Sequence, residues 1–233
     1  MHTAHRLTAA LVLTGAAALG LTGCQDTPTR SYPGASAPKM LSESVTALRG
    51  ASSFTVSGKT VTKGVPTQVA LSISKTGECT GTMSFSEGTL KVVRTHKHVF
   101  LQGDEAAARA QTQDLPADEA EQAFEDITTR WVRREVSDPG LKGLTALCDR
   151  DGMLKEFYSF SGDAMESGTA EAGGRKAVSI VAVKHVFLVA AEGEPYLLKV
   201  TKAGPEGMDL DYTGINQPVQ VDVPAEADVY END

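Results

Sequence analysis

Three of the five histidines in this chain are placed where they could hold a metal ion. His96 and His98 are two residues apart, so on a strand they would share one face, and H-x-H is a known spacing of zinc ligands. A third ligand would have to come from elsewhere, such as His185 or a carboxylate. His185 belongs to the second copy of the pentapeptide "KHVFL", which occurs at 97–101 and again at 184–188. The residues flanking the two copies differ, which favours two similar strands over an internal repeat. Two histidines at strand period more often mark a partly exposed edge, so we expect no metal site.

Other reactive side chains are not arranged for catalysis. The chain has no G-x-S-x-G motif, and "AGGRK" at 172–176 lacks the preceding strand and the Lys-Ser/Thr pair of a phosphate-binding loop. Acidic clusters such as "ADEAEQ" at 117–122 are typical of solvated helix starts. The net charge of −8 argues against binding to nucleic acid. We therefore expect a protein that is not an enzyme, needs no cofactor and binds no nucleic acid.

The N-terminal residues predict export. A short basic start is followed by "LTAALVLTGAAALG", an apolar stretch of 14 residues that suits the core of a signal peptide and is too short for a permanent membrane span. The next residues, "LTGC" at 21–24, resemble the lipobox of bacterial lipoproteins, in which the cysteine is diacylglycerated and the chain is cut before it. An ordinary signal peptide with an unrelated Cys24 is the alternative.

This interpretation divides the chain into three parts. Residues 1–23 would be the lipoprotein signal peptide, residues 24–37 a flexible tether rich in Pro, Ser and Thr, and residues 38–233 a single domain. Two acyl chains on Cys24 would hold the mature protein stably at the outer face of the cell membrane. We expect the membrane to be a partner through these chains.

Two cysteines remain once Cys24 is acylated. An even remainder in an exported protein is most simply a disulfide, here between Cys79 and Cys148. Two free, buried thiols are the alternative. A redox-active pair is disfavoured because no C-x-x-C spacing is present.

Hydrophobic periodicity predicts an α+β fold. Apolar residues alternate with polar ones in several short segments, as antiparallel strands with one buried face require; these are 54–58, 68–74, 82–87, 195–202, 207–213 and 218–224. A helical stripe runs from Pro116 to Trp131, and shorter helical patterns lie at 41–48, 138–147 and 153–157. The order is a helix, about five strands, two or three helices and about five more strands.

The lipobox, "ECTGTMSF", "TRWVRR", "VFLVAAEGEPYLLKV" and "PVQVDVP" together resemble exported lipoproteins of high-GC Gram-positive bacteria, of the LolA-like and LppX-like lipid-carrier group. The resemblance implies a curved antiparallel sheet of about ten strands, a half-barrel wrapped around a few helices, with an apolar cavity between the layers. It brings no catalytic residues, and only Cys24 carries over as a functional residue.

Two functions follow from these patterns. The first is a membrane-anchored lipoprotein that binds or shuttles an apolar ligand, either a lipid or a lipidated protein, in a cavity between sheet and helices. Residues expected to line that cavity are Met83, Phe85, Met208, Leu210 and Tyr212. The second is a non-enzymatic interaction or sensing lipoprotein of the cell envelope, in which the same side chains form a filled core.

Overall fold

The computed structural model describes residues 34–62 and 64–231. The predicted signal peptide and Cys24 therefore lie outside the described residues. The helices are α1 (Ala37–Gly50), α2 (Glu105–Thr112), α3 (Ala117–Thr129), α4 (Lys142–Leu147) and α5 (Arg150–Tyr158). The strands are β1 (Ser53–Thr62), β2 (Val65–Ser74), β3 (Cys79–Phe85), β4 (Gly88–Arg94), β5 (His98–Gly103), β6 (Trp131–Glu135), β7 (Met165–Ala172), β8 (Arg175–Ala182), β9 (His185–Ala190), β10 (Leu197–Lys202), β11 (Met208–Thr213) and β12 (Val229–Glu231).

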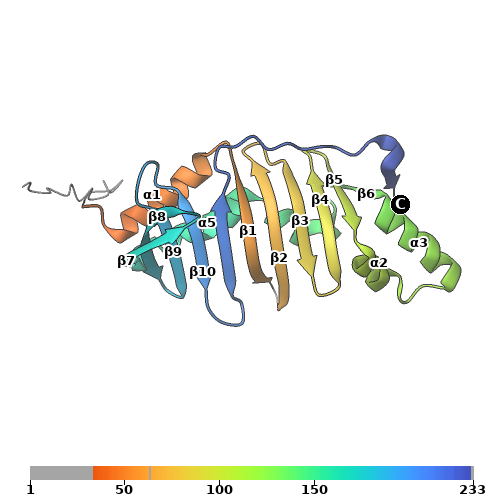
Figure 1. Ribbon diagram of the computed structural model, residues 1–233, viewed down its shortest axis with the longest axis horizontal. Helices are drawn as coiled ribbons and strands as arrows, with labels where there is room; N and C mark the ends of the chain where they lie inside the picture. The colour runs from red at the N-terminus through yellow and green to blue at the C-terminus, as the bar shows by residue number, and fades with distance from the viewer. Residues whose placement is uncertain (1–33, 63, 232–233) are drawn as a thin grey trace, which may run out of the picture.

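All twelve strands form one open sheet in the order β12-β6-β5-β4-β3-β2-β1-β11-β10-β9-β8-β7. The first five strands run outward from the centre, and the last long strands return from the other edge, so β1 pairs with β11 in the middle (Figure 1). Neighbouring strands are antiparallel except for β12, which pairs with β6 in parallel. The predicted α+β class and the large curved antiparallel sheet are thus confirmed, with somewhat more strands than expected.

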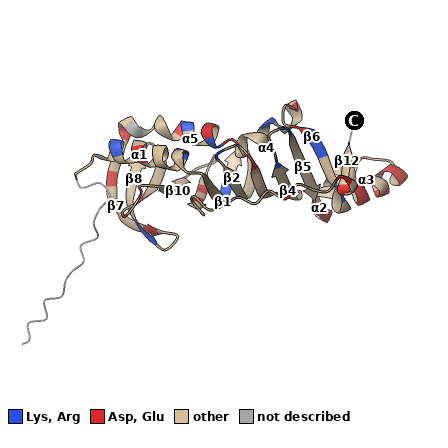
Figure 2. Cartoon of the chain, turned by 90° about the horizontal axis from the view of Figure 1, so that it is seen from above, with Lys and Arg blue, Asp and Glu red and all other residues tan. Residues whose placement is uncertain are grey.

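The helices α1, α4 and α5 cover one face of the sheet, which we call the inner face (Figure 2). The alternation seen in the sequence places Phe54 and Val56 of β1 on this face, where both are buried. Aromatic contacts continue the core, with the rings of Phe54 and Tyr212 5.7 Å apart and those of Phe157 and Phe187 5.6 Å apart. Edge-to-face pairs of this kind add to the free energy gained from burial.

Two glycines allow the strands to coil tightly in the middle of the sheet. Gly58 and Gly81 have φ values of +140° and +148°, which side chains rarely tolerate. A Cβ atom at either position would lie 2.0 Å from a carbonyl oxygen of the neighbouring strand, that of Asp209 or of Ala70. Glycines at such points let a sheet curve around what it covers.

Three sequence-based expectations were wrong. A strand does precede "AGGRK" at 172–176, because β7 ends at Ala172, but strand β8 follows it where a phosphate-binding loop would have a helix. Trp131 does not extend the preceding helix, because α3 ends at Thr129 and Trp131 begins β6, the strand next to the edge strand β12. The segment 218–224 forms no strand, although its valines alternate. It belongs to an irregular stretch that crosses the upper end of the sheet in Figure 1 before β12 pairs with β6.

Two links hold α5 against the rest of the core. The disulfide between Cys79 and Cys148 joins the start of β3 to the residue after α4, with both cysteines buried, so this predicted pairing is present. The guanidinium of Arg150 donates from Nη2 to the carbonyl oxygens of Leu48 at 3.1 Å and Ala51 at 3.0 Å, and also to that of Arg49. It therefore satisfies carbonyl groups that the C-terminal end of α1 leaves open.

Removing the disulfide should destabilise the fold without abolishing it. The sequence separation of 69 residues corresponds to about 4 kcal/mol in the chain-entropy model. We expect a Cys79→Ala/Cys148→Ala variant to lose about 2–4 kcal/mol of unfolding free energy, measured by urea denaturation. A loss below about 1 kcal/mol would show that the pair contributes little.

Replacing Arg150 should release α1 from α5. Arg150→Gln removes the Nη2 donor that the carbonyl groups of Leu48, Arg49 and Ala51 share, so we expect a loss of about 2–3 kcal/mol in unfolding free energy. Arg150→Lys keeps the charge but has a shorter side chain without the planar guanidinium group, and it should recover only part of that loss. Equal stability of both variants and the parent would contradict the role given to Arg150.

Candidate ligand pocket

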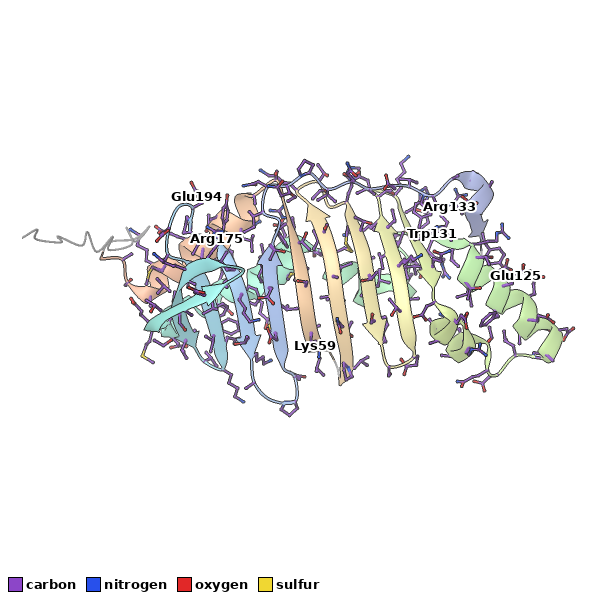
Figure 3. All side chains as sticks on the ribbon, viewed as in Figure 1. Lys59, Glu125, Trp131, Arg133, Arg175 and Glu194 are labelled. Atoms are coloured by element: carbon purple, nitrogen blue, oxygen red, sulfur yellow. A yellow bond between two sulfur atoms is a disulfide. The ribbon has the colours of Figure 1, made fainter. Side chains whose placement is uncertain are left out.

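An apolar pocket of about 580 Å³ is lined by residues of β1, β2, β3 and β11, at the ends of these strands that point downward in Figure 1. Each of these strands, with the turn next to it, contributes three consecutive residues to the lining, and the middle residue of each triplet is on the inner face. These four inward-facing residues, called here the rim row, are Thr60, Thr67, Phe85 and Met208. Cross-strand pairing places Thr60 between Met208 on one side and Thr67 on the other. Phe85 lies beside Thr67, because their neighbours Gln68 and Ser84 are paired. Figure 3 marks the place by Lys59, the residue before Thr60.

A smaller cavity of about 100 Å³ continues from this pocket under the helices. Thr60 and Met208 line both spaces, so the two are adjoining. Leu147, Met153 and Phe157 form its helical wall. The only charged side chain in this lining is that of Glu156. Together the two spaces form an apolar path from the lower edge of the sheet into the core.

The five residues predicted to line a cavity are spread over different environments. Phe85 and Met208 line the pocket, and Met208 and Leu210 line the smaller cavity. Met83 is packed in the core with 1% of its surface exposed. The ring of Tyr212 is also buried, and its hydroxyl group lies 3.7 Å from Met153 Sδ as a donor. Burial raises the pKa of this phenol far above its ordinary value.

Sequence reasoning missed the two threonines of the rim row. Thr60 and Thr67 continue the inward alternation of β1 and β2, but a search for apolar side chains passes over them. Their small size is what leaves space at this end of the sheet, where larger residues would fill it. The helical residues Met153 and Phe157 were predicted as a helix face, although not as part of a cavity wall.

His185 lies two strands away from Met208, in an unusual environment. Its ring stacks on Phe160 at 4.4 Å and on Phe187 at 5.7 Å, and it is 3% exposed. Neither ring nitrogen has a hydrogen-bond partner. Burial lowers the pKa of His185, and the charge of Lys202, its partner on β10, lowers it further, while Glu156 acts in the opposite direction.

The two "KHVFL" strands face opposite ways and lie far apart. On β5, Phe100 belongs to a small cluster on the outer face, whereas on β9 Phe187 is in the main core. Six strands separate β5 from β9, which corresponds to about 34 Å at the usual strand spacing. His98 pairs instead with Glu135 at 3.3 Å, and His96 lies in the bend before β5. Within residues 34–62 and 64–231, no group of three or more potential metal-ligating side chains lies together.

A second hollow lies on the outer face of the sheet. Its volume is about 620 Å³, and its lining includes charged and polar side chains such as Arg175, Tyr196 and Asp211. Figure 3 shows Arg175 and Glu194 at the end of the molecule where the β7–β8 hairpin lies. This mixed lining distinguishes the hollow from the apolar pocket of the inner face.

The fold class is therefore an open, curved sheet that carries its helices on one face. An apolar pocket lies beside these helices. Among solved structures, this chain is similar to LprF from Mycobacterium bovis, with a TM-score of 0.51 at 11% identity over 81% of this chain and 97% of that one. The lipoprotein LppX of Mycobacterium tuberculosis aligns over 79% of this chain and 99% of its own, with a TM-score of 0.47 at 16% identity. The similarity to LprF confirms the predicted resemblance at the level of the fold.

Sequence comparisons add nothing to this likeness. No protein-family model and no curated protein matches the chain. Among the described helices, none is both long enough and apolar enough to cross a bilayer.

The buried histidine should make stability depend on pH. Because the folded-state pKa of His185 lies below its unfolded value of about 6.5, the unfolded chain binds the extra proton first as pH falls. We expect this site to make no difference well above pH 6.5 and to destabilise the fold increasingly below it. The slope is at most about 1.4 kcal/mol per pH unit for one proton.

The measurement compares the parent chain with His185→Leu by urea denaturation between pH 7.5 and about pH 5. The difference in unfolding free energy should shift in favour of the variant as pH falls. Parallel curves for the two proteins would show that His185 titrates alike in the folded and unfolded states.

Proposed function

We propose that this protein is an exported lipoprotein that binds or shuttles an apolar ligand, a lipid or the acyl chain of a lipidated protein. The observation that carries the proposal is the apolar pocket at the rim row and its continuation under α5. Its volume falls in the range of about 300–1,000 Å³ that is usual for small-molecule sites. Phe85, Met208 and Leu210 are the predicted cavity residues that would contact the ligand.

The size of the inner cavity favours a slender ligand. The core around it is filled by side chains with no exposed surface, such as Leu71, Leu154 and Phe187. A single acyl chain could lie along the rim row and enter between Met208 and Phe157, whereas a bulky, multiply branched lipid would require the helices to move. Each buried methylene group would add about 0.8 kcal/mol to binding.

Cys24 supplies the proposed location. Acylation of its thiol would hold the protein at the outer face of the cell membrane, close to a source of lipid. The shared fold with LprF supports this placement only as far as architecture goes. The protein would act without catalytic groups, by solvating an apolar chain.

The filled part of the core supports a second function. Met83 and Tyr212 were predicted cavity residues, and both are buried among core side chains. In an interaction or sensing lipoprotein the pocket would be a surface depression without a ligand. The two functions differ in whether an apolar molecule binds at the rim row.

The decisive experiment is to titrate the full chain with cis-parinaric acid, a fluorescent fatty acid, and to examine the purified protein by native mass spectrometry. We expect saturable binding and extra mass that organic extraction removes. Thr60→Trp fills the pocket and should weaken binding at least tenfold. Thr82→Trp is the matched control, because Thr82 lies on the opposite face of β3 and lines neither space, so it should leave binding within twofold.

A variant with more space guards against a misfolded Thr60→Trp protein. Met208→Ala enlarges the pocket and should alter affinity while keeping the far-ultraviolet circular dichroism of the parent. Absence of saturable binding by the parent chain, together with a clean unliganded mass, would favour the interaction protein.

A further inference from the structure

Large apolar side chains are exposed at few places in the described part of the chain. They are Val65 at 46%, Leu115 at 41%, Met165 at 67%, Val183 at 61% and Val223 at 54%. Isolated exposed residues of this kind are common and need no explanation. Their distribution is informative here because three of them lie at those ends of the strands where the pocket opens.

Strand register places Val65, Met165 and Val183 at the end where the pocket opens. Val65 begins β2 beside the rim row, and its neighbour Pro66 lines the pocket. Met165 pairs with Val181 near the end of β8, and Val183 follows in the turn to β9. Lys202 of β10 pairs with both His185 and Met208, which connects the β8–β9 turn to the pocket along one edge.

Val183 occupies a backbone conformation that valine normally avoids. Its φ is +56°, in a two-residue turn between the paired residues Ala182 and His185. Two-residue hairpin turns give this first position to glycine or asparagine, because a β-branched side chain is strained there. Val183 is unfavourable for the stability of the protein in two ways, because its backbone is strained and its apolar side chain is exposed to water. Strained backbone positions are typical of functional sites.

Lys184, the second residue of this turn, is also exposed. It forms no ion pair with any residue that the structure describes. An apolar tip beside a free lysine suits the interface of a bilayer, where the apolar group enters the headgroup region and the amine meets phosphate.

The proposed anchor would keep this edge near a membrane. Cys24 precedes Gly34 by ten residues, and a chain of that length spans at most about 36 Å when fully extended. Helix α1, which follows, contacts β7 and β9, the strands that carry Met165 and border Val183. The tether is therefore attached on the side of the sheet that carries Met165 and Val183.

We propose that this edge, with Val65, Met165, Val183 and Lys184 as its contact residues, docks on a lipid bilayer and admits an acyl chain from it to the pocket. The proposal rests on the proposed function, because the edge has this use only if the pocket takes a lipid. Few and shallow apolar tips make the contact weak and reversible, as exchange of ligand requires.

The test uses the full chain with Cys24→Ala, so that an anchor does not mask the contact and the first residues contribute equally to every variant. Vesicles of phosphatidylcholine and phosphatidylglycerol in a molar ratio of about three to one provide an anionic surface. We expect Val65→Asp/Met165→Asp/Val183→Asp to reduce co-sedimentation with these vesicles at least fivefold. Val223→Asp, in the segment that crosses the opposite edge in Figure 1, is the matched control and should bind as the parent does.

Binding of cis-parinaric acid in solution separates this proposal from the proposed function. The triple variant should keep its solution affinity within twofold and lose transfer of the probe from vesicles. If vesicle binding is unchanged in the triple variant, or falls equally with Val223→Asp, the docking edge is wrong even where the pocket binds the probe. If no variant or parent binds the probe in solution, the proposed function fails first.

Val183→Asn gives a second, independent measurement. Asparagine tolerates positive φ, so the variant should unfold at a temperature about 2–4 °C higher than the parent. It should also bind vesicles less well, because the apolar tip is gone. A residue with a merely structural role would not produce stabilisation and weaker membrane binding together, and a variant that gains stability with unchanged vesicle binding would overturn the proposal.

Discussion

The fold depends on keeping short helices against a wide apolar sheet. Helices α4 and α5 have six and nine residues, too few to be stable as isolated helices in water. Arg150 holds α5 to the end of α1 through backbone carbonyl groups, and its guanidinium lies 5.3 Å from the ring centre of Phe54. Burial lowers the pKa of this arginine, because removing the guanidinium group from water disfavours its charged form. The disulfide adds a second link from the same region to β3.

The helices cover only part of the inner face. The helical layer reaches Leu147, Met153 and Phe157, and beyond them the rim row is left open. Small threonines at 60 and 67 deepen this opening, and Phe85 and Met208 keep it apolar. A pocket thus arises where the helices end, and its inward-facing row is mostly apolar.

Much of the sheet could be predicted because period-two alternation in β1, β2 and β11 reports which face of a strand is buried. The cysteine pairing was predictable for a similar reason, since export leaves few alternatives for two cysteines. The path of residues 218–224 was not, because Val219, Val221 and Val223 alternate like a strand while no neighbouring strand is free to pair with them. The pocket was only half predictable, since Met83 and Phe85 have the same pattern but different helical cover.

The repeated pentapeptide shows the same limit. Local sequence specifies that His and Phe share a side, but the pairing partners decide whether that side faces the helices. On β9 the shared side carries buried His185, and on β5 it carries half-exposed His98. Val183 shows the converse, because only the backbone conformation reveals that this ordinary residue is strained.

The two ends of the sheet differ in how they avoid pairing with another molecule. At one end, parallel β12 lies against β6 and covers it. At the other end β7 is exposed, yet its register shifts between Glu166 and Gly168, and it carries acidic residues. A bulge and negative charge on an outermost strand discourage edge-to-edge growth. Copies crowded together on one surface would therefore remain separate particles instead of polymerising through their backbones.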